Sequence, residues 1–127
     1  DAVEHRVLRL ARDERLDAGQ AFRLGLARAI LRKPAVMVIE EPTEPLDDDT
    51  KALLDDAYNR ITRDRTVVFL PTRLSTVRRC DQVALIHEGR IVATGSQEVL
   101  VKQSELYRHW EYLNFVAPQT VLRTVKP

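Results

Sequence analysis

Two short apolar runs, set apart by a segment of helical length, constrain the fold of this chain more than any other feature. The first extends from Val36 to Ile39 and the second from Thr66 to Leu70, and a proline follows shortly after each. Uninterrupted apolar runs of this length are typical of strands that are buried on both faces of a parallel sheet. The sequence therefore predicts an α/β fold in which both runs are inner strands.

Amphipathic segments before and between these runs predict helices. The first covers residues 21–31, has Asp17 as its N-cap and ends at Lys33-Pro34. The second begins in the acidic segment 47–50 and reaches about residue 63. Its expected buried face consists of Leu54, Ala57, Tyr58 and Ile61. Helices that alternate with buried strands favour a mostly parallel sheet with flanking helices.

The second half of the chain predicts smaller elements. Residues 74–79 fit one helical turn, and residues 82–87 and 90–94 fit a hairpin closed by Glu88-Gly89. Short helices are expected after Ser96 and Ser104. We expect residues 1–115 to form one domain and residues 116–127, which have no periodicity, to form a disordered tail. Because the order begins with a helix, the sheet is expected to lack its first strands at the N-terminal side.

Composition excludes several function classes. The 127 residues include 20 basic and 19 acidic side chains, so the net charge of +1 gives no electrostatic reason to expect nucleic acid as a partner. A single cysteine, Cys80, rules out an internal disulfide. No apolar run approaches the roughly 18 residues that a membrane-spanning helix needs. The chain is therefore expected to be soluble.

Four segments, in order, resemble the ATP-binding-cassette (ABC) ATPases of the exporter type. They are RLDAGQAFRLGLARAIL (15–31), VMVIEEPTEPLD (36–47), VVFLPTRLSTVRRCDQVALIHEGRIVATGS (67–96) and SELYRHWEYL (104–113). They match the signature motif with its helix, the Walker B strand with the D-loop, the switch segment with two strands, and the C-terminal helix. The resemblance implies the C-terminal half of a nucleotide-binding domain, with a P-loop NTPase-like fold that is truncated at the N-terminus.

For a complete parent protein, the resemblance implies an ATPase that couples ATP binding and hydrolysis to transmembrane export. Its cofactors would be ATP and Mg²⁺. Its partners would be a second nucleotide-binding domain and transmembrane domains, at the cytoplasmic face of the membrane. This chain contains no G-x-x-x-x-G-K-[ST] phosphate loop among its four glycines, so we expect it to be inactive alone and to bind neither cofactor.

Signature-motif positions correspond here to Leu16, Asp17, Ala18, Gly19 and Gln20. In the family this loop lies at a helix N-terminus and contacts the ATP that the partner domain holds. Asp17 stands where the family has a serine that donates to the γ-phosphate. A carboxylate only accepts hydrogen bonds, and two like charges about 4 Å apart cost about 4 kcal/mol at an effective dielectric constant near 20. The alternative is that Asp17 is simply a helix cap.

Glu40 and Glu41 correspond to the Walker B pair. The family has an aspartate at the first position, which holds Mg²⁺, and a glutamate at the second, which polarises the attacking water. The side chain of Glu40 is one methylene longer than that of aspartate, which shifts its carboxylate from the position of the family's metal ligand. Glu41 has the family's residue type. Asp47 ends the D-loop, which crosses the dimer interface in the family. The alternative is that both glutamates are solvated loop acids.

Thr72 is the largest departure from the family's pattern. The family has a histidine here that contacts the γ-phosphate and the attacking water, and a threonine has neither the charge nor the reach of an imidazole. The alternative is a plain turn at Pro71-Thr72. These departures indicate a degenerate ATPase site.

Two other functions remain open on the sequence. One is a soluble ABC ATPase that does not transport, and the other is a regulatory or structural pseudo-ATPase domain that works by protein contacts. Because a sheet without its first strands exposes apolar surface, we also expect the fragment to self-associate.

Overall fold

The computed structural model describes residues 15–117; the charged segment 1–14 and residues 118–127 of the expected tail lie outside the described residues. The chain divides into two compact units, with a first unit of Asp1–Leu70 and a second unit of Pro71–Pro127. Within residues 15–117, none of the helices combines the length and the apolar character that crossing a bilayer requires.

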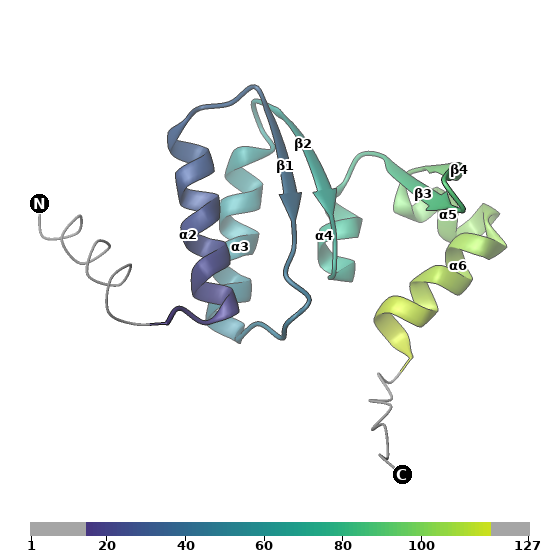
Figure 1. The fold of residues 1–127 in the computed structure, drawn as a ribbon. Helices are drawn as coiled ribbons and strands as arrows, with labels where there is room; N and C mark the ends of the chain where they lie inside the picture. The colour runs from purple at the N-terminus through teal and green to yellow at the C-terminus, as the bar shows by residue number, and fades with distance from the viewer. Residues whose placement is uncertain (1–14, 118–127) are drawn as a thin grey trace, which may run out of the picture. The chain divides into compact units, whose positions relative to one another are not determined.

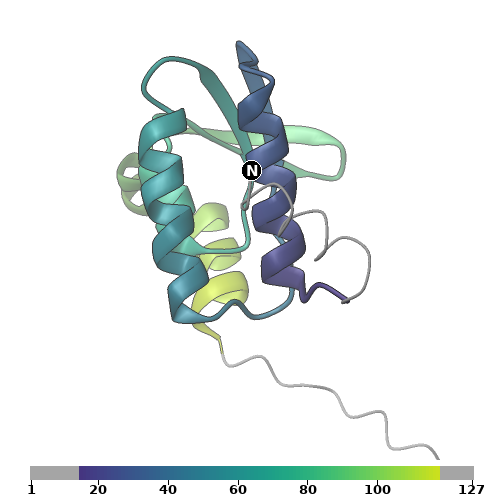
Figure 2. The same cartoon turned by 90° about the vertical axis from the view of Figure 1, so that its left-hand side faces the viewer.

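The first unit has the predicted order of helix, strand, helix and strand. Its elements are α2 (Ala18–Leu31), β1 (Val36–Glu40), α3 (Asp48–Ile61) and β2 (Thr66–Leu70). β1 and β2 pair in parallel, with Val36 opposite Thr66 and Glu40 opposite Leu70. Both helices lie against the same face of this two-stranded sheet (Figure 1, Figure 2). The parallel pairing of the two apolar runs is therefore confirmed.

Local chemistry sets the helix boundaries. Asp17 and Asp47 are the N-caps of α2 and α3, and α2 begins three residues before the predicted start because the capping residue directly precedes it. After α2, Lys33 adopts a left-handed conformation with φ of 50°, which ends the helix just before Pro34.

Only one face of the β1–β2 sheet is buried, so the expectation of strands buried on both faces is wrong for this chain. Met37 and Ile39 of β1 pack with Leu26, Leu54, Tyr58 and Ile61 in one core cluster. The alternating residues Val36, Val38, Val68 and Leu70 are 47% to 68% exposed. The reason is that α2 and α3 cover the same face, and no other element within residues 15–70 covers the opposite one.

The second unit contains the predicted hairpin and short helices. Its elements are α4 (Leu74–Arg79), β3 (Val83–His87), β4 (Arg90–Gly95), α5 (Gln97–Gln103), α6 (Glu105–Glu111) and a final π-helical turn, η1 (Tyr112–Val116). Glu88 and Gly89 both have positive φ, 49° and 75°, as a two-residue hairpin turn requires. β3 and β4 therefore form their own antiparallel sheet, and the described residues do not contain one mostly parallel sheet.

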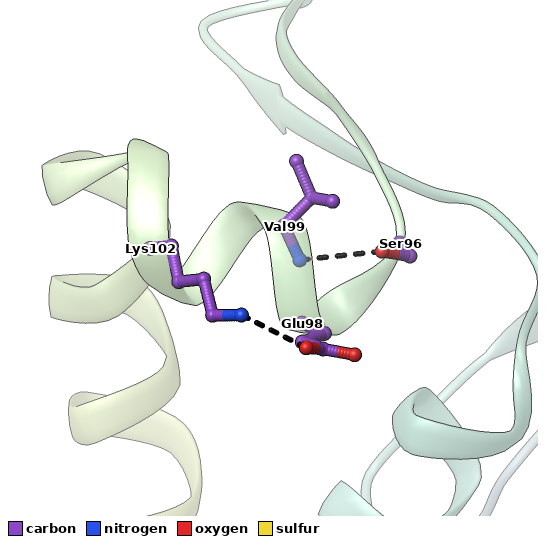
Figure 3. A network of polar contacts seen from close by, with 4 residues as sticks. All are labelled: Ser96, Glu98, Val99 and Lys102. Carbon is purple, nitrogen blue, oxygen red and sulfur yellow. Dashed lines mark hydrogen bonds and ion pairs between the residues drawn. The ribbon is translucent and has the colours of Figure 1, made fainter.

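Serine caps start both helices that follow the hairpin. The Ser96 hydroxyl accepts a hydrogen bond from the backbone N–H of Val99 at 3.2 Å, and Lys102 pairs with Glu98 one turn along α5 at 2.9 Å (Figure 3). Ser104 caps α6 in the same way. These helices bury Leu100 and Tyr107 against Leu85 of β3, which gives the second unit a core of its own.

The exposed sheet face predicts self-association of the 127-residue chain. Burying apolar surface between two copies is favourable, so we expect dimers or larger species in analytical ultracentrifugation as concentration rises. Val38→Lys introduces a charge on this face and should shift the chain toward the monomer. Val92→Lys, at a position of the second unit that is 44% exposed, is the matched control and should leave the distribution unchanged. A wild-type chain that stays monomeric at every concentration would contradict the prediction.

Candidate functional site

The predicted signature residues 16–20 form the start of α2. The Asp17 carboxylate accepts a hydrogen bond from the backbone N–H of Gln20 at 2.8 Å, and the Gln20 side-chain oxygen accepts one from the backbone N–H of Asp17 at 3.1 Å. This reciprocal pair is a capping box, so the interpretation of Asp17 as a helix cap is confirmed. The Gln20 N–H at the helix start is therefore bonded to a carboxylate of the same chain.

Gly19 lies where α2 meets the start of α3. A Cβ atom at this position would lie 3.3 Å from Asp17 Oδ1 and 3.4 Å from Thr50 Oγ1, so a larger residue would push the two helix starts apart. The backbone N–H of Thr50 donates to Asp47 Oδ1 at 2.6 Å. This hydrogen bond holds the pKa of Asp47 below its ordinary value. The packing thus places the D-loop carboxylate beside the signature residues.

Glu40 and Glu41 end β1 and have opposite environments. Successive side chains of a strand point to opposite faces, and Glu40 is exposed whereas Glu41 is only 3% exposed. An open pocket of about 420 Å³ adjoins them, lined by Ala18, Phe22, Glu40, Glu41, Pro42, Thr43 and Glu44. The end of β1 and the start of α2 therefore border one pocket.

The buried Glu41 makes hydrogen bonds through both its backbone and its side chain. Its backbone N–H donates to the carbonyl oxygen of Leu70 at 3.0 Å, which continues the parallel pairing of β1 and β2. Its carboxylate oxygen Oε2 accepts a hydrogen bond from the Tyr58 hydroxyl at 3.1 Å. Tyr58 itself is fully buried, and its ring meets that of Phe69 edge-on at 4.9 Å.

A magnesium ion would meet exposed carboxylates at this pocket, among them those of Glu40 and Glu44. The residues that the structure describes contain no group of three or more His, Cys, Asp or Glu side chains that could hold a metal ion. Mg²⁺ is commonly bound through one or two carboxylates, with water and phosphate oxygens completing its shell. The exposed carboxylate of Glu40 fits that role, and the other ligands would come from phosphate and water.

Thr72 belongs to the second unit and is exposed in the turn between β2 and α4. The other predicted site residues, 16–20, 40, 41 and 47, all lie in the first unit. The expectation that Thr72 acts with them stays a prediction.

Tyr58 is the residue whose role the sequence did not reveal. Its helical spacing predicts a core residue, and it is one. Buried tyrosines usually find a hydrogen-bond partner for their hydroxyl, and a carboxylate at the end of the neighbouring strand is a suitable acceptor. The sequence signal for this contact was the combination of a tyrosine on the buried face of a helix and a carboxylate at the end of the neighbouring strand.

Comparison with models of known protein families gives no match. Individual relatives do match. An ATP-dependent lipid A-core flippase of Xanthomonas oryzae pv. oryzae (strain MAFF 311018) is 37% identical over 105 residues, which are 83% of this chain and 18% of the relative. The flippase of Xanthomonas euvesicatoria pv. vesicatoria (strain 85-10) is 39% identical over 101 residues, 80% of this chain and 17% of the relative. The ABC transporter B family member 21 of Arabidopsis thaliana is 41% identical over 90 residues, 71% of this chain and 7% of the relative.

The chain thus spans less than a fifth of the length of these relatives. Two of them are bacterial flippases and one is a plant ABC transporter, and the matches cover most of the chain in each case. The four motifs occur in the order of the exporter type, with departures at Asp17, Glu40 and Thr72. The chain therefore belongs to the ABC transporter family, in which it corresponds to the C-terminal half of an exporter-type nucleotide-binding domain.

Proposed function

We propose that the chain is part of an ATP-binding domain that couples ATP binding and hydrolysis to export across a membrane. The observation that carries this proposal is the pair of carboxylates directly after the buried part of β1, an exposed Glu40 and a buried Glu41, which border one open pocket. In the working protein, a second nucleotide-binding domain and transmembrane domains complete the assembly at the cytoplasmic face of the membrane.

Each predicted site residue has a proposed task. The start of α2 faces the phosphates of an ATP that the partner domain holds, because free N–H groups and the helix dipole favour an anion there. Glu40 is a ligand of the Mg²⁺ ion that accompanies ATP, which offsets the charge of the phosphates. Glu41 polarises the attacking water. Asp47 extends the D-loop toward the dimer interface, and Thr72 takes the place of the switch histidine.

A regulatory pseudo-ATPase is the second candidate, and a specific contact favours it. The Asp17 carboxylate already accepts the Gln20 N–H, so a phosphate at this helix start meets a negative charge and one donor fewer. A domain with this cap transmits conformational change by contact with its partner while its own hydrolysis is slow.

ATP binding tests the proposal. The 127-residue chain has no phosphate loop to surround the β- and γ-phosphates, so isothermal titration with Mg-ATP should detect no micromolar binding. The same segment within a complete nucleotide-binding domain, which supplies a phosphate loop, should bind. A micromolar dissociation constant for the isolated chain would contradict the first expectation. A complete domain that does not bind would favour the pseudo-ATPase.

A further inference from the structure

The contact between Glu41 and Tyr58 joins the proposed water-activating carboxylate to the hydrophobic core. Glu41 borders the open pocket, yet only 3% of the residue is exposed, and its Oε2 atom is bonded to the Tyr58 hydroxyl at 3.1 Å. The neighbouring Glu40 is exposed. The two glutamates at the end of β1 therefore differ in how easily water reaches them.

Packing fixes the position of the Tyr58 hydroxyl. The ring is fully buried among Leu54, Ile61 and Met37 of the core cluster, and its edge-on contact with Phe69 has an interplanar angle of 64°. A buried aromatic ring in a close-packed core has little freedom to move. The hydroxyl therefore stays where α3 places it, and the carboxylate of Glu41 turns to meet it.

We propose that Tyr58 is a positioning residue that withholds Glu41 from the pocket. Its hydroxyl keeps the carboxylate turned toward α3, on the core side of the strand end. This inference rests on the proposed function only where it treats Glu41 as the group that polarises the attacking water. The withheld position itself is independent of that function.

A withheld carboxylate slows water activation. A general base acts within about 2.6–3.2 Å of the group whose proton it attracts. To reach a water in the pocket, the Glu41 carboxylate must break its hydrogen bond to the Tyr58 hydroxyl. This costs free energy, because the buried hydroxyl then loses that partner. Tyr58 thus makes the resting site less reactive than a site with a freely accessible Glu41 carboxylate.

Carboxyl labelling tests the withheld position on the 127-residue chain. A water-soluble carbodiimide with an amine nucleophile modifies accessible carboxyl groups, and mass spectrometry reads each site separately. In the wild type, Glu41 should be labelled much more slowly than the exposed Glu40. Tyr58→Phe removes only the hydroxyl and should raise the labelling rate of Glu41 several-fold while leaving that of Glu40 unchanged. Tyr107→Phe is the matched control. It removes the hydroxyl of Tyr107, the fully buried tyrosine of the second unit, and should change the labelling rate of neither Glu40 nor Glu41.

Amide hydrogen exchange separates release of the side chain from local unfolding. The Glu41 N–H bonded to Leu70 should remain protected in Tyr58→Phe, because the pairing of β1 and β2 is intact. If that protection is lost, the comparison of Glu41 with Glu40 in the wild type remains the test, and slower labelling of Glu41 is the expected result. Equal labelling of Glu41 in the wild type and in a folded Tyr58 variant would overturn the proposal, as would wild-type labelling of Glu41 as fast as that of Glu40.

ATP turnover reports on the proposed function separately. In a complete nucleotide-binding domain that hydrolyses ATP, Tyr58→Phe should raise kcat and leave KM unchanged, and the rise should vanish in a Glu41→Gln background. A rise in kcat that persists in the Glu41→Gln background would show that Tyr58 does not act through Glu41. A complete domain that hydrolyses no ATP even with Asp17→Ser, Glu40→Asp and Thr72→His, with labelling as expected, would refute the proposed ATPase and support the withheld position.

Discussion

Replacing Leu54 by alanine is expected to lower the free energy of unfolding of the first unit by about 2–5 kcal/mol. Leu54 is 1% exposed and belongs to the core cluster between α3 and the sheet. Its truncation removes buried methyl groups and leaves a cavity that the short strands β1 and β2 close only in part.

The adjacent Leu53 provides the control, because it is on the same helix and 48% exposed. Leu53→Ala should cost less than about 1 kcal/mol, since about half of the residue already meets water. Urea denaturation followed by circular dichroism, at one protein concentration to hold self-association constant, measures both variants. Equal destabilisation by the two substitutions would show that α3 does not bury the face that the structure assigns to it.

Local signals predicted the elements of the fold well. The two apolar runs became β1 and β2 within one residue, and Asp17, Asp47, Ser96 and Ser104 are all helix caps. Each of these features depends on residues close in sequence, such as a side-chain oxygen that accepts a hydrogen bond from the backbone N–H three positions later. Such features can therefore be read from a single sequence.

Burial and pairing at long range were harder to predict. The apolar run around Val38 has the same composition whether or not a second layer covers it, so the sequence did not show that one face is exposed. The hairpin signal at Glu88-Gly89 defines only its own two strands, so the sequence did not show that they form a separate sheet. The bond between Glu41 and Tyr58 joins residues 17 positions apart, and it depends on how α3 is placed over β1.

The site residues themselves came from the resemblance, because single residues such as Thr72 carry no recognisable signal outside the motif. Glu40 and Glu41 border the same open pocket, which supports their assignment to one site. The capping box adds what the motif alone did not show, namely that Asp17 uses its carboxylate within the helix start.

The second large effect concerns ATP hydrolysis by a complete domain that contains this segment. We expect three departures to weaken the site: Asp17 brings a negative charge to the phosphate, the longer side chain of Glu40 displaces the metal-binding carboxylate, and Thr72 lacks the imidazole. Loss of one transition-state donor commonly lowers the rate by a factor of about 10² to 10³. Since we propose that the signature residues act on the partner's ATP, we expect a homodimer to combine all three defects in each of its sites.

Restoring the three residues should therefore raise turnover by a factor of about 10² or more. The restored variant carries Asp17→Ser, Glu40→Asp and Thr72→His. Serine is as good an N-cap as aspartate, so the first change keeps the start of α2 intact. A matched control makes similar changes at exposed positions of the second unit, Thr94→His and Glu98→Asp, and should leave turnover unchanged.

Steady-state ATP turnover of the complete domain as a homodimer tests the central claim most directly. The account predicts a rate close to the background for the unmodified domain and a rate at least about 100-fold higher for the restored one. An unmodified domain that already turns over at about one per second or faster, with no gain on restoration, would contradict the account.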